Sequence, residues 1–573
     1  MKPIGPNVVS HALRATTVDS NKLPVMKNLD PTYIANQIDP IPGLEDPVPG
    51  GQAAETARRA PGQRTLTAKE REQRQLALGA TVPSKDEAMC QCTKVLHFSV
   101  FFDGTGNNRD QELAKPLERR ALSNIFKLWS AHKADTNVLR QYIPGVGTPY
   151  PEIGDAGGML GSAIGKGAEQ RIKKALELLD EEIAKVPAQQ KLLLINVTVF
   201  GFSRGAAQAR AFIRDLAAKC ATQDGAYAYK GKPLRIAFAG LFDTVCSAYD
   251  GLPSATFTAN GGHNGWAHDV KLPPMVEQTV HMNAAHELRR RFPLDSTRVD
   301  AGYPDNTVEI WYPGVHSDVG GGYEPKFQGR ENTISRFALN QMFDNAFTAG
   351  VLFNKLAKLA PEVQDEFTKD DPQLRAAFNA YVDAVPMKTG PMEEVQAAHM
   401  ELLHRWLKKR VTDKTDQPSV QRLKARRDKT RQSSHELNER RMAMLREAGV
   451  ANEYDDKFPA ERRAEYDDIL KRMLQNGADD GEIDDAIHDL AKEDRKYVFD
   501  VANIAYRAEQ GAKLNLRERT IKAAWDNQSP LPEAVDNFFD AFAHDSVAHF
   551  DFDTSRLTDW RTIYFGETKY KPS

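Results

Sequence analysis

Four near-continuous apolar runs, each ending at a polar or glycine-rich cluster, most constrain the fold of this chain. They begin at Lys94, Lys191, Pro233 and Asn306 and read KVLHFSVFF, KLLLINVTVFGF, PLRIAFAGLF and NTVEIWY. Strands that are covered on both faces have this composition, because neither face meets water. A weaker candidate strand spans residues 138–148. The runs therefore predict the buried strands of one sheet.

Helical periodicity precedes the second of these runs. Apolar residues recur every three or four positions from Ile172 to Val186, as on one face of an amphipathic helix. Strands that alternate with helices are typical of a parallel α/β sheet. We therefore predict an α/β fold with a mostly parallel sheet.

Composition divides the 573 residues into four parts. Residues 1–88 are rich in proline and glycine and are predicted to form an extended arm. Residues 89–360 contain the apolar runs and form the predicted α/β domain. Residues 361–530 are charged and helical, and are interpreted as a large helical insert that contacts a membrane or a partner. Residues 531–573 regain apolar density and are expected to return to the α/β domain.

Charge and cysteine content exclude several classes of protein. The formal net charge is -3, from 76 basic and 79 acidic residues, which gives no overall bias toward nucleic acid. Cys90, Cys92, Cys220 and Cys246 are too few and too scattered for a disulfide framework or a zinc site, so we expect reduced thiols, no metal and no cofactor. Neither a signal peptide nor a stretch of about 18 apolar residues is found, so we expect a cytoplasmic product without a cleaved export signal.

The second apolar run leads into a Gly-x-Ser-x-Gly motif, Gly201 to Gly205, and then into small, helix-favouring residues. The motif is common by chance, but its setting of strand, turn and helix is what a nucleophile elbow requires. The glycines remove Cβ clashes from a strained turn, and the helix N-terminus directs free N–H groups toward the serine. We therefore interpret Ser203 as a nucleophile and not as a serine of an ordinary turn.

A serine nucleophile needs a base, and the base needs an orienting acid. Asp243 ends the third run and His316 ends the fourth, so in a parallel sheet both meet Ser203 at one edge. The chain order Ser, Asp, His is that of α/β-hydrolases, which makes the predicted fold α/β-hydrolase-like. Asp318 is an alternative acid, although an Asp before glycines more often anchors a turn. His544 is the reserve base, because the C-terminal segment is expected to return to this edge.

Three other histidines are weaker candidates for the base. His281 and His286 lie in the stretch VEQTVHMNAAHELRRRF, which reads as a helix whose histidines lie at the surface or between helices. His97 alternates within the first predicted strand and is expected to be a core residue.

Acyl transfer also needs donors for the oxyanion. One is expected to be the backbone N–H of Arg204, and the others to come from Gly104 and Thr105, in the loop DGTGNN after the first run. That loop has neither the lysine of a P-loop nor the spacing of a dinucleotide fingerprint, which argues against a nucleotide site.

Five motifs, in this order, resemble those of a known family: FFDGTGNN, GFSRGAA, FAGLFDTV, HMNAAHELRRRFPLD and WYPGVHSDVGGGY. Over about residues 94–350, and in the C-terminal HDS and RTIYFG, the chain resembles the α/β-hydrolase family that includes the first family of bacterial type VI secretion lipase effectors. The resemblance implies that Ser203, Asp243 and His316 are the triad. It also implies phospholipase A activity, chiefly at the sn-2 ester, with a phospholipid membrane as the substrate.

The same resemblance implies a biological setting. The protein is expected in the cytoplasm of the producing cell and then, after secretion, in the periplasm or membrane of a target cell. A spike or adaptor protein of a type VI secretion apparatus and a cognate immunity protein are the implied partners, with no nucleic acid. Two other functions stay open: a soluble carboxylesterase or thioesterase with the same triad, and a non-enzymatic binding module. The module would use the basic stretch 404–431, but acidic residues nearby favour a solvated helix face.

One segment of the insert allows two interpretations. In ELLHRWLKKR, residues 401–410, Trp406 and three leucines adjoin Lys408, Lys409 and Arg410. Apolar anchors beside basic side chains can meet a bilayer surface. Alternatively, an ordinary helix buries its apolar side against the domain, which is the interpretation that we favour.

Overall fold

A computed structural model of the chain describes residues 60–79, 93–158, 166–223, 225–246, 263, 265–299, 302–368, 371–413, 415–548 and 555–565. Most of the N-terminal arm expected over residues 1–88 lies outside these ranges, as do Cys90 and Cys92. Within the arm, α3 (Ala68–Gly79) is helical. Arg64, before this helix, pairs with Glu70 and donates to the carbonyl of Val276, so this part of the arm contacts the α/β domain.

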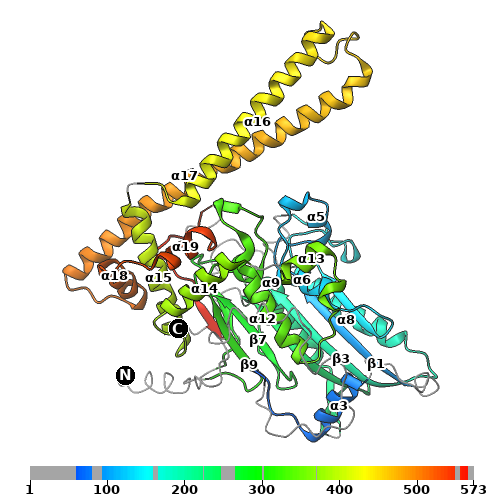
Figure 1. The fold of residues 1–573 in the computed structure, drawn as a ribbon. Helices are drawn as coiled ribbons and strands as arrows, with labels where there is room; N and C mark the ends of the chain where they lie inside the picture. The colour runs from blue at the N-terminus through cyan, green and yellow to red at the C-terminus, as the bar shows by residue number, and fades with distance from the viewer. Residues whose placement is uncertain are drawn as a thin grey trace.

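Among the described residues, eight strands form the main sheet, and the strands in the order β2-β1-β3-β6-β7-β9 are all parallel (Figure 1). The hairpin of β4 and β5 pairs antiparallel with the start of β6, and β8 and β10 form a separate parallel pair. The strands are β1 (Thr93–Phe102), β2 (Val138–Ile143), β3 (Lys191–Phe202), β4 (Cys220–Gln223), β5 (Ala226–Tyr229), β6 (Lys232–Phe242), β7 (Thr279–Ala284), β8 (Leu294–Ser296), β9 (Thr307–Tyr312) and β10 (Ile563–Phe565). The predicted mostly parallel α/β fold is confirmed.

Helices cover both faces of this sheet. On one face, Phe101 of β1 and Phe200 of β3 pack with residues of α6 (Asn124–Ala131) and α12 (Ser335–Thr348). On the other face, Phe98 of β1 and Val197 of β3 pack with residues of α8 (Lys166–Ala184) and α9 (Arg204–Ala217). Successive side chains of a strand point to opposite faces, so strands between two helical layers are apolar throughout.

The helices after residue 360 continue the first of these cores. They are α13 (Pro361–Thr368), α14 (Pro372–Ala384), α15 (Met392–Thr412), α16 (Pro418–Ala448), α17 (Arg463–Glu509), α18 (Leu516–Asp526) and α19 (Glu533–Ala541). Phe378 of α14, Trp406 of α15, Tyr497 of α17 and Phe538 of α19 belong to the same hydrophobic cluster as Phe200 of the sheet. The base of the helical part is thus packed continuously with the α/β part.

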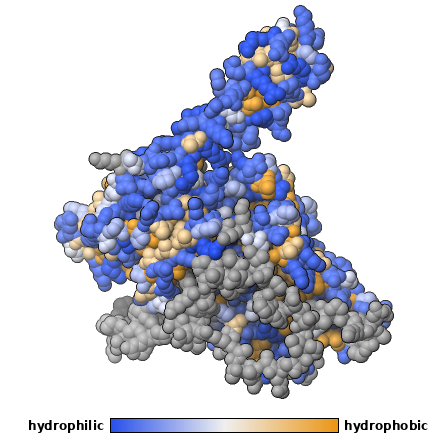
Figure 2. Space-filling model, viewed as in Figure 1, coloured by the Kyte–Doolittle hydropathy of each residue, from blue (hydrophilic) through white to orange (hydrophobic). Residues whose placement is uncertain are grey.

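Most of α16 and the first half of α17 form a two-helix arm that projects from the body of the molecule (Figure 1). Charged residues link the two helices: Arg427 pairs with Asp484, and Arg431 with Asp480. A small apolar cluster that includes Leu445, Phe458, Tyr466 and Ile469 closes the distal end. The surface of this two-helix arm is mainly hydrophilic (Figure 2). Among the described residues, none of the helices has the length and apolarity needed to cross a membrane.

The two interpretations of residues 401–410 can be compared directly. Leu402, Leu403, Trp406 and Leu407 are all buried, and Trp406 stacks on Phe539 of α19 with ring centroids 5.5 Å apart. Five basic residues of the stretch 404–431 pair with acidic residues of the chain: Lys409 with Asp536, Arg410 with Asp494, Arg422 with Asp540, Arg427 with Asp484, and Arg431 with Asp480. The apolar side of this helix therefore faces the domain, as the second interpretation holds.

Burial of Trp406 leads to a stability prediction. Trp406→Ala should lower the free energy of unfolding by about 3–5 kcal/mol, because it removes a large buried ring and leaves a cavity. Leu474→Ala is the control, since Leu474 of α17 is 77% exposed, and should change stability by no more than about 0.5 kcal/mol. Urea unfolding of both variants measures the difference. Equal stability of the two would contradict burial of Trp406.

One segment that reads as a helix is a strand. Residues 279–284 form β7, at the position between β6 and β9, with all six residues buried. Its histidine is satisfied on both ring nitrogens: His281 Nδ1 hydrogen-bonds Glu309 Oε1 at 2.7 Å, and its Nε2 bonds Thr244. Pairing with two strands therefore overrides the helical appearance of the sequence.

Candidate active site

Ser203 lies between β3 and α9 in a strained conformation. Its φ is 59° and its ψ is -129°, in a region that non-glycine residues rarely adopt. Two backbone bonds to the neighbouring strand end hold the turn: Ser203 N–H donates to Phe242 O at 3.0 Å, and Val245 N–H donates to Ser203 O at 3.3 Å. Backbone strain that neighbours maintain is a frequent property of functional residues.

The two glycines of the motif permit close packing around Ser203. A Cβ on Gly201 would lie 2.5 Å from Ala206 Cα, so helix α9 approaches β3 closely. A Cβ on Gly205 would lie 2.3 Å from Asp103 O and 2.4 Å from Phe102 O, at the end of β1. Only a residue without a side chain fits at either position.

Gly205→Ala should lower the free energy of unfolding by about 3 kcal/mol, because rigid backbone atoms must move to admit the methyl group. Gly481→Ala is a matched control on α17, where a Cβ would meet nothing within 4 Å, and should raise stability by about 1 kcal/mol. Chemical denaturation of the two variants tests this. A Gly205→Ala variant as stable as the parent would show that the end of β1 does not lie so close to Gly205.

Asp243 and His316 meet at the ends of neighbouring strands. Asp243 follows β6 directly, and His316 begins the short helix α11 (His316–Gly320) after β9. His316 Nδ1 lies 2.5 Å from Asp243 Oδ2. The His316 ring also packs on Phe202, the residue before Ser203, with ring centroids 4.6 Å apart. The structure thus brings all three residues of the expected triad to the carboxyl edge of the sheet.

Arg561 is a partner of Asp243 that sequence reasoning missed. Its guanidinium binds both carboxylate oxygens of Asp243, at 2.6 Å each, and all of these atoms are buried. Burial alone would raise the pKa of Asp243, but the Arg561 charge and the His316 hydrogen bond together hold that pKa well below its usual range. Asp243 is therefore an anion in the folded protein.

A second charged pair lies beside His316. Glu287, which follows β7, accepts the backbone N–H of His316 at 3.2 Å and pairs with Arg289. Arg289 offsets the burial of Glu287 and brings its pKa down to about 2. Burial lowers the pKa of His316, although the bond to Asp243 acts in the opposite direction. The imidazole is consequently neutral near pH 7, as a general base must be.

The two reserve candidates, Asp318 and His544, bind each other. His544 Nδ1 lies 2.6 Å from Asp318 Oδ1, and the His544 backbone N–H donates to Asp318 Oδ2 at 2.9 Å. Asp318 also accepts the N–H of Val315, which fixes the turn that carries His316. This pair therefore ties the C-terminal segment to α11, as the expected return of that segment requires.

The loop after β1 contacts Arg204, the residue that follows Ser203. Thr105 Oγ1 accepts from the Arg204 side chain at 2.5 Å, and the Gly104 N–H donates to Asp103 Oδ1 at 2.7 Å. Burial raises the pKa of Asp103 to about 6, even though Tyr142 and Ser123 both donate to its carboxylate. Asp103 thus anchors the loop that contains Gly104 and Thr105.

Among the described residues, Cys246, His263 and Asp295 form a group whose ligand atoms lie within 4.8 Å of one another. Hydrogen bonds already use His263 Nε2 and both carboxylate oxygens of Asp295: His263 Nε2 bonds Oδ1, and the Cys246 backbone N–H donates to Oδ2 at 2.8 Å. The Arg210 side chain also donates to the Asp295 carbonyl. The cluster is explained as a link between β8 and the end of β6, and Cys246 and Cys220 are free thiols.

The remaining candidate histidines form hydrogen bonds with residues other than Ser203. His97 is buried in β1 and contacts Asn196, and burial lowers its pKa to about 4, as expected for a core residue. His286 accepts the N–H of Gly314 and bonds the Tyr381 hydroxyl of α14. It follows β7 and is not on a helix, which corrects its predicted setting.

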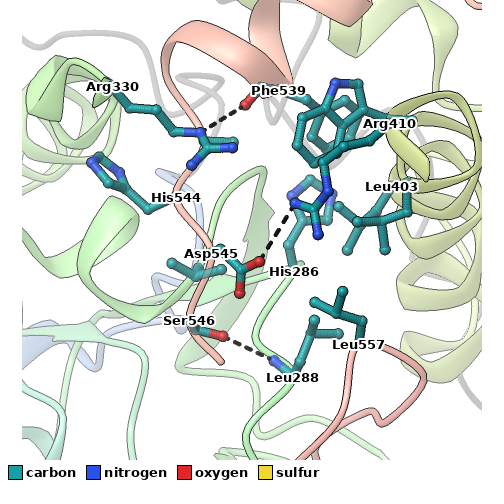
Figure 3. A pocket seen from close by; sticks show the side chains of 14 residues that line it. His286, Leu288, Arg330, Leu403, Arg410, Phe539, His544, Asp545, Ser546 and Leu557 are labelled. Atoms are coloured by element: carbon teal, nitrogen blue, oxygen red, sulfur yellow. Dashed lines mark hydrogen bonds and ion pairs between the residues drawn. The ribbon is translucent and has the colours of Figure 1, made fainter. Parts of the chain in front are cut away.

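A cavity of about 20 Å³ lies behind the turn that carries His316, with room for about one water molecule. Its lining includes Val315 and residues of α15 and the C-terminal segment, among them Arg410, Asp545 and Ser546 (Figure 3). None of Ser203, Asp243 and His316 lines it. The cavity is therefore a packing feature between the helical part and the C-terminal segment, separate from the edge at Ser203.

The parallel sheet, the strained serine between glycines and the order Ser, Asp, His place the chain in the class of α/β-hydrolase-like proteins. Residues 97–222 and 217–345 match the family described as T6SS, phospholipase effector Tle1-like, catalytic domain. This part of the chain is therefore similar to the catalytic domain of Tle1-like phospholipase effectors of the type VI secretion system, a family that implies hydrolase chemistry. The resemblance read from the five motifs is confirmed.

Solved structures add a comparison of the fold. The chain is similar to the crystal structure of an uncharacterized protein from Pseudomonas aeruginosa, with 24% identity and a TM-score of 0.57, over 89% of this chain and 84% of that chain. A structure of the Tle1 effector bound to the VgrG spike from the Type 6 secretion system aligns with 20% identity and a TM-score of 0.36, over 54% of this chain and 84% of that chain. A comparison with curated proteins found no match.

Proposed function

We propose that this protein is a phospholipase A that hydrolyses an acyl ester of membrane glycerophospholipids, preferably at sn-2, through an acyl-enzyme on Ser203. The observation that carries the proposal is the strained Ser203 turn beside the buried His316–Asp243 pair. The match of this region to a phospholipase effector family supports the substrate class.

The proposed chemistry uses each residue in turn. His316 Nε2 takes the Ser203 proton while Oγ attacks the ester carbonyl carbon, and Asp243 stabilises the imidazolium through Nδ1. The tetrahedral intermediate then loses the lysolipid alkoxide, which leaves with the proton from Nε2. Water attacks the acyl-enzyme by the same route, so that a fatty acid is released and Ser203 is restored.

The proposed oxyanion donors are backbone N–H groups on both sides of Ser203. Arg204 follows the nucleophile at the start of α9, and its contact with Thr105 brings the β1 loop to the elbow. The Gly104 N–H already binds Asp103, so of the two loop residues we favour the Thr105 N–H.

The proposed partners follow from the family. A phospholipid membrane is the substrate, a spike or adaptor protein carries the effector out of the producing cell, and an immunity protein protects that cell. We propose that the protein acts in the periplasm or membrane of a target cell, and that residues 361–530 serve substrate access or partner docking.

One experiment tests the activity. Purified protein is incubated with vesicles of phosphatidylethanolamine and phosphatidylglycerol that carry different labels on the sn-1 and sn-2 acyl chains. Release of the sn-2 fatty acid together with lysolipid is expected, and Ser203→Ala is the control. Hydrolysis of dispersed short-chain esters without any release from vesicles would instead favour a soluble carboxylesterase with the same triad.

A further inference from the structure

Arg561 makes Asp243 an unusually crowded carboxylate. Asp243 Oδ2 accepts from His316 Nδ1 at 2.5 Å and from Arg561 Nη1 at 2.6 Å. Its Oδ1 accepts from Arg561 Nη2 at 2.6 Å and from the Ala284 N–H at 2.7 Å. With four donors around it, the carboxylate has one allowed orientation. The planar guanidinium fork sets that orientation better than a single donor would.

Besides Asp243, the guanidinium of Arg561 meets the Trp311 ring, whose centroid lies 5.9 Å from Cζ. Its side chain is fully buried, its Nη2 also donates to Ala284 O at 2.7 Å, and the carboxylate of Asp243 is its ion-pair partner. An arginine is almost never fully buried unless it is paired. The cation is therefore placed to neutralise the acid that binds His316.

Neighbouring strands hold Arg561 in this position. It precedes β10, which pairs in parallel with β8, and the Leu294 N–H donates to Thr562 O at 2.8 Å. In β8, the Asp295 N–H donates to the carbonyl of Thr244, the residue after Asp243. The C-terminal segment is thus connected, through β8, to the residue that follows Asp243.

We propose that Arg561 is a positioning residue of the active site, which fixes the orientation of Asp243 and limits how strongly this acid attracts a proton to His316. The inference rests on the proposed function of Ser203, Asp243 and His316. It extends that function to a residue 318 positions away from Asp243 in the chain.

The electrostatic consequence has a definite sign. The charged groups that face His316 are Asp243, Arg289 and Glu287, with the Asp318–His544 pair on the other side of α11 and Arg561 behind Asp243. Without Arg561, a positive charge near the imidazolium is lost and Asp243 acts on His316 alone. Both changes favour protonated His316, so the pKa of its imidazole rises.

The test compares the pH dependence of kcat/KM in the full-length protein and three variants. In Arg561→Gln, the acid limb should move to higher pH by roughly 1 unit, because a nearby charge shifts a pKa by about that much. The plateau kcat should fall about 100-fold through misorientation, with KM unchanged. In Arg561→Lys, which keeps the charge and loses the fork, kcat should fall while the acid limb stays in place. Arg556→Gln is the matched control, an arginine of the same segment that pairs with Asp500 and is half exposed, and its profile should equal that of the parent.

Several results would overturn the inference. A folded Arg561→Gln variant with the acid limb of the parent shows that Arg561 does not act on His316. If Arg561→Gln does not fold, the test relies on Arg561→Lys. A kcat of Arg561→Lys equal to that of the parent contradicts the positioning role. If Ser203→Ala keeps full activity, the proposed function itself is wrong and this inference falls with it. An inactive Ser203→Ala together with unchanged Arg561 variants rejects this inference alone.

Discussion

Ser203→Ala should lower phospholipid hydrolysis by roughly a million-fold, the scale observed when the nucleophile of a triad is removed. The hydroxyl provides the atom that forms the acyl bond, and no neighbouring group replaces it in the proposed route. Turnover of labelled vesicles under saturating substrate measures the loss. Folding should be kept, because the Ser203 turn is held by backbone bonds to Phe242 and Val245 and by the glycines on either side.

Ser335→Ala is a matched control for this prediction. Ser335 is a buried serine at the start of α12, where its hydroxyl donates to Asn332 O at 3.2 Å. Its replacement removes a comparable hydroxyl away from the strand ends, so turnover should stay near that of the parent. Appreciable turnover by Ser203→Ala, or an equal loss in Ser335→Ala, would show that Ser203 is not the nucleophile.

The strands that carry the candidate site could be predicted because their signal is local. Strands β1, β3 and β6 are largely apolar on both faces and end directly before Asp103, Ser203 and Asp243, while β9 ends four residues before His316. Parallel pairing then brings Ser203, Asp243 and His316 together without any further information. The placement of Asp318 and His544 near this edge was also predicted, although they bind each other.

The segment RTIYFG belongs to the resemblance, but the contact of its Arg561 with Asp243 could not be predicted from the sequence. Its role depends on the pairing of β10 with β8, two strands of three residues each that are far apart in the chain. Strand β7 was missed for a related reason. His281 and Asn283 interrupt its apolar pattern, although the strand is buried between β6 and β9.

The last prediction separates the two candidate acids. Asp243→Asn should lower kcat about ten-thousand-fold, because an amide next to His316 Nδ1 favours the wrong tautomer of the imidazole. Asparagine is the suitable replacement, since Asp243 has a φ of 43° and Asn tolerates this left-handed conformation. The variant also leaves Arg561 buried without its anion, so urea unfolding must accompany the kinetic measurement.

Asp318→Asn is the same substitution two residues from His316, and it should act differently. Asp318 holds Val315 and His544, so its loss should weaken the attachment of the C-terminal segment and lower stability. The hydrogen bond between His316 and Asp243 does not involve Asp318, so most of kcat should remain at a temperature where the variant is folded. The reverse result, with Asp318→Asn inactive and Asp243→Asn active, would assign the orienting acid to Asp318. Because Arg561 binds Asp243, that result would also remove the positioning role proposed for Arg561.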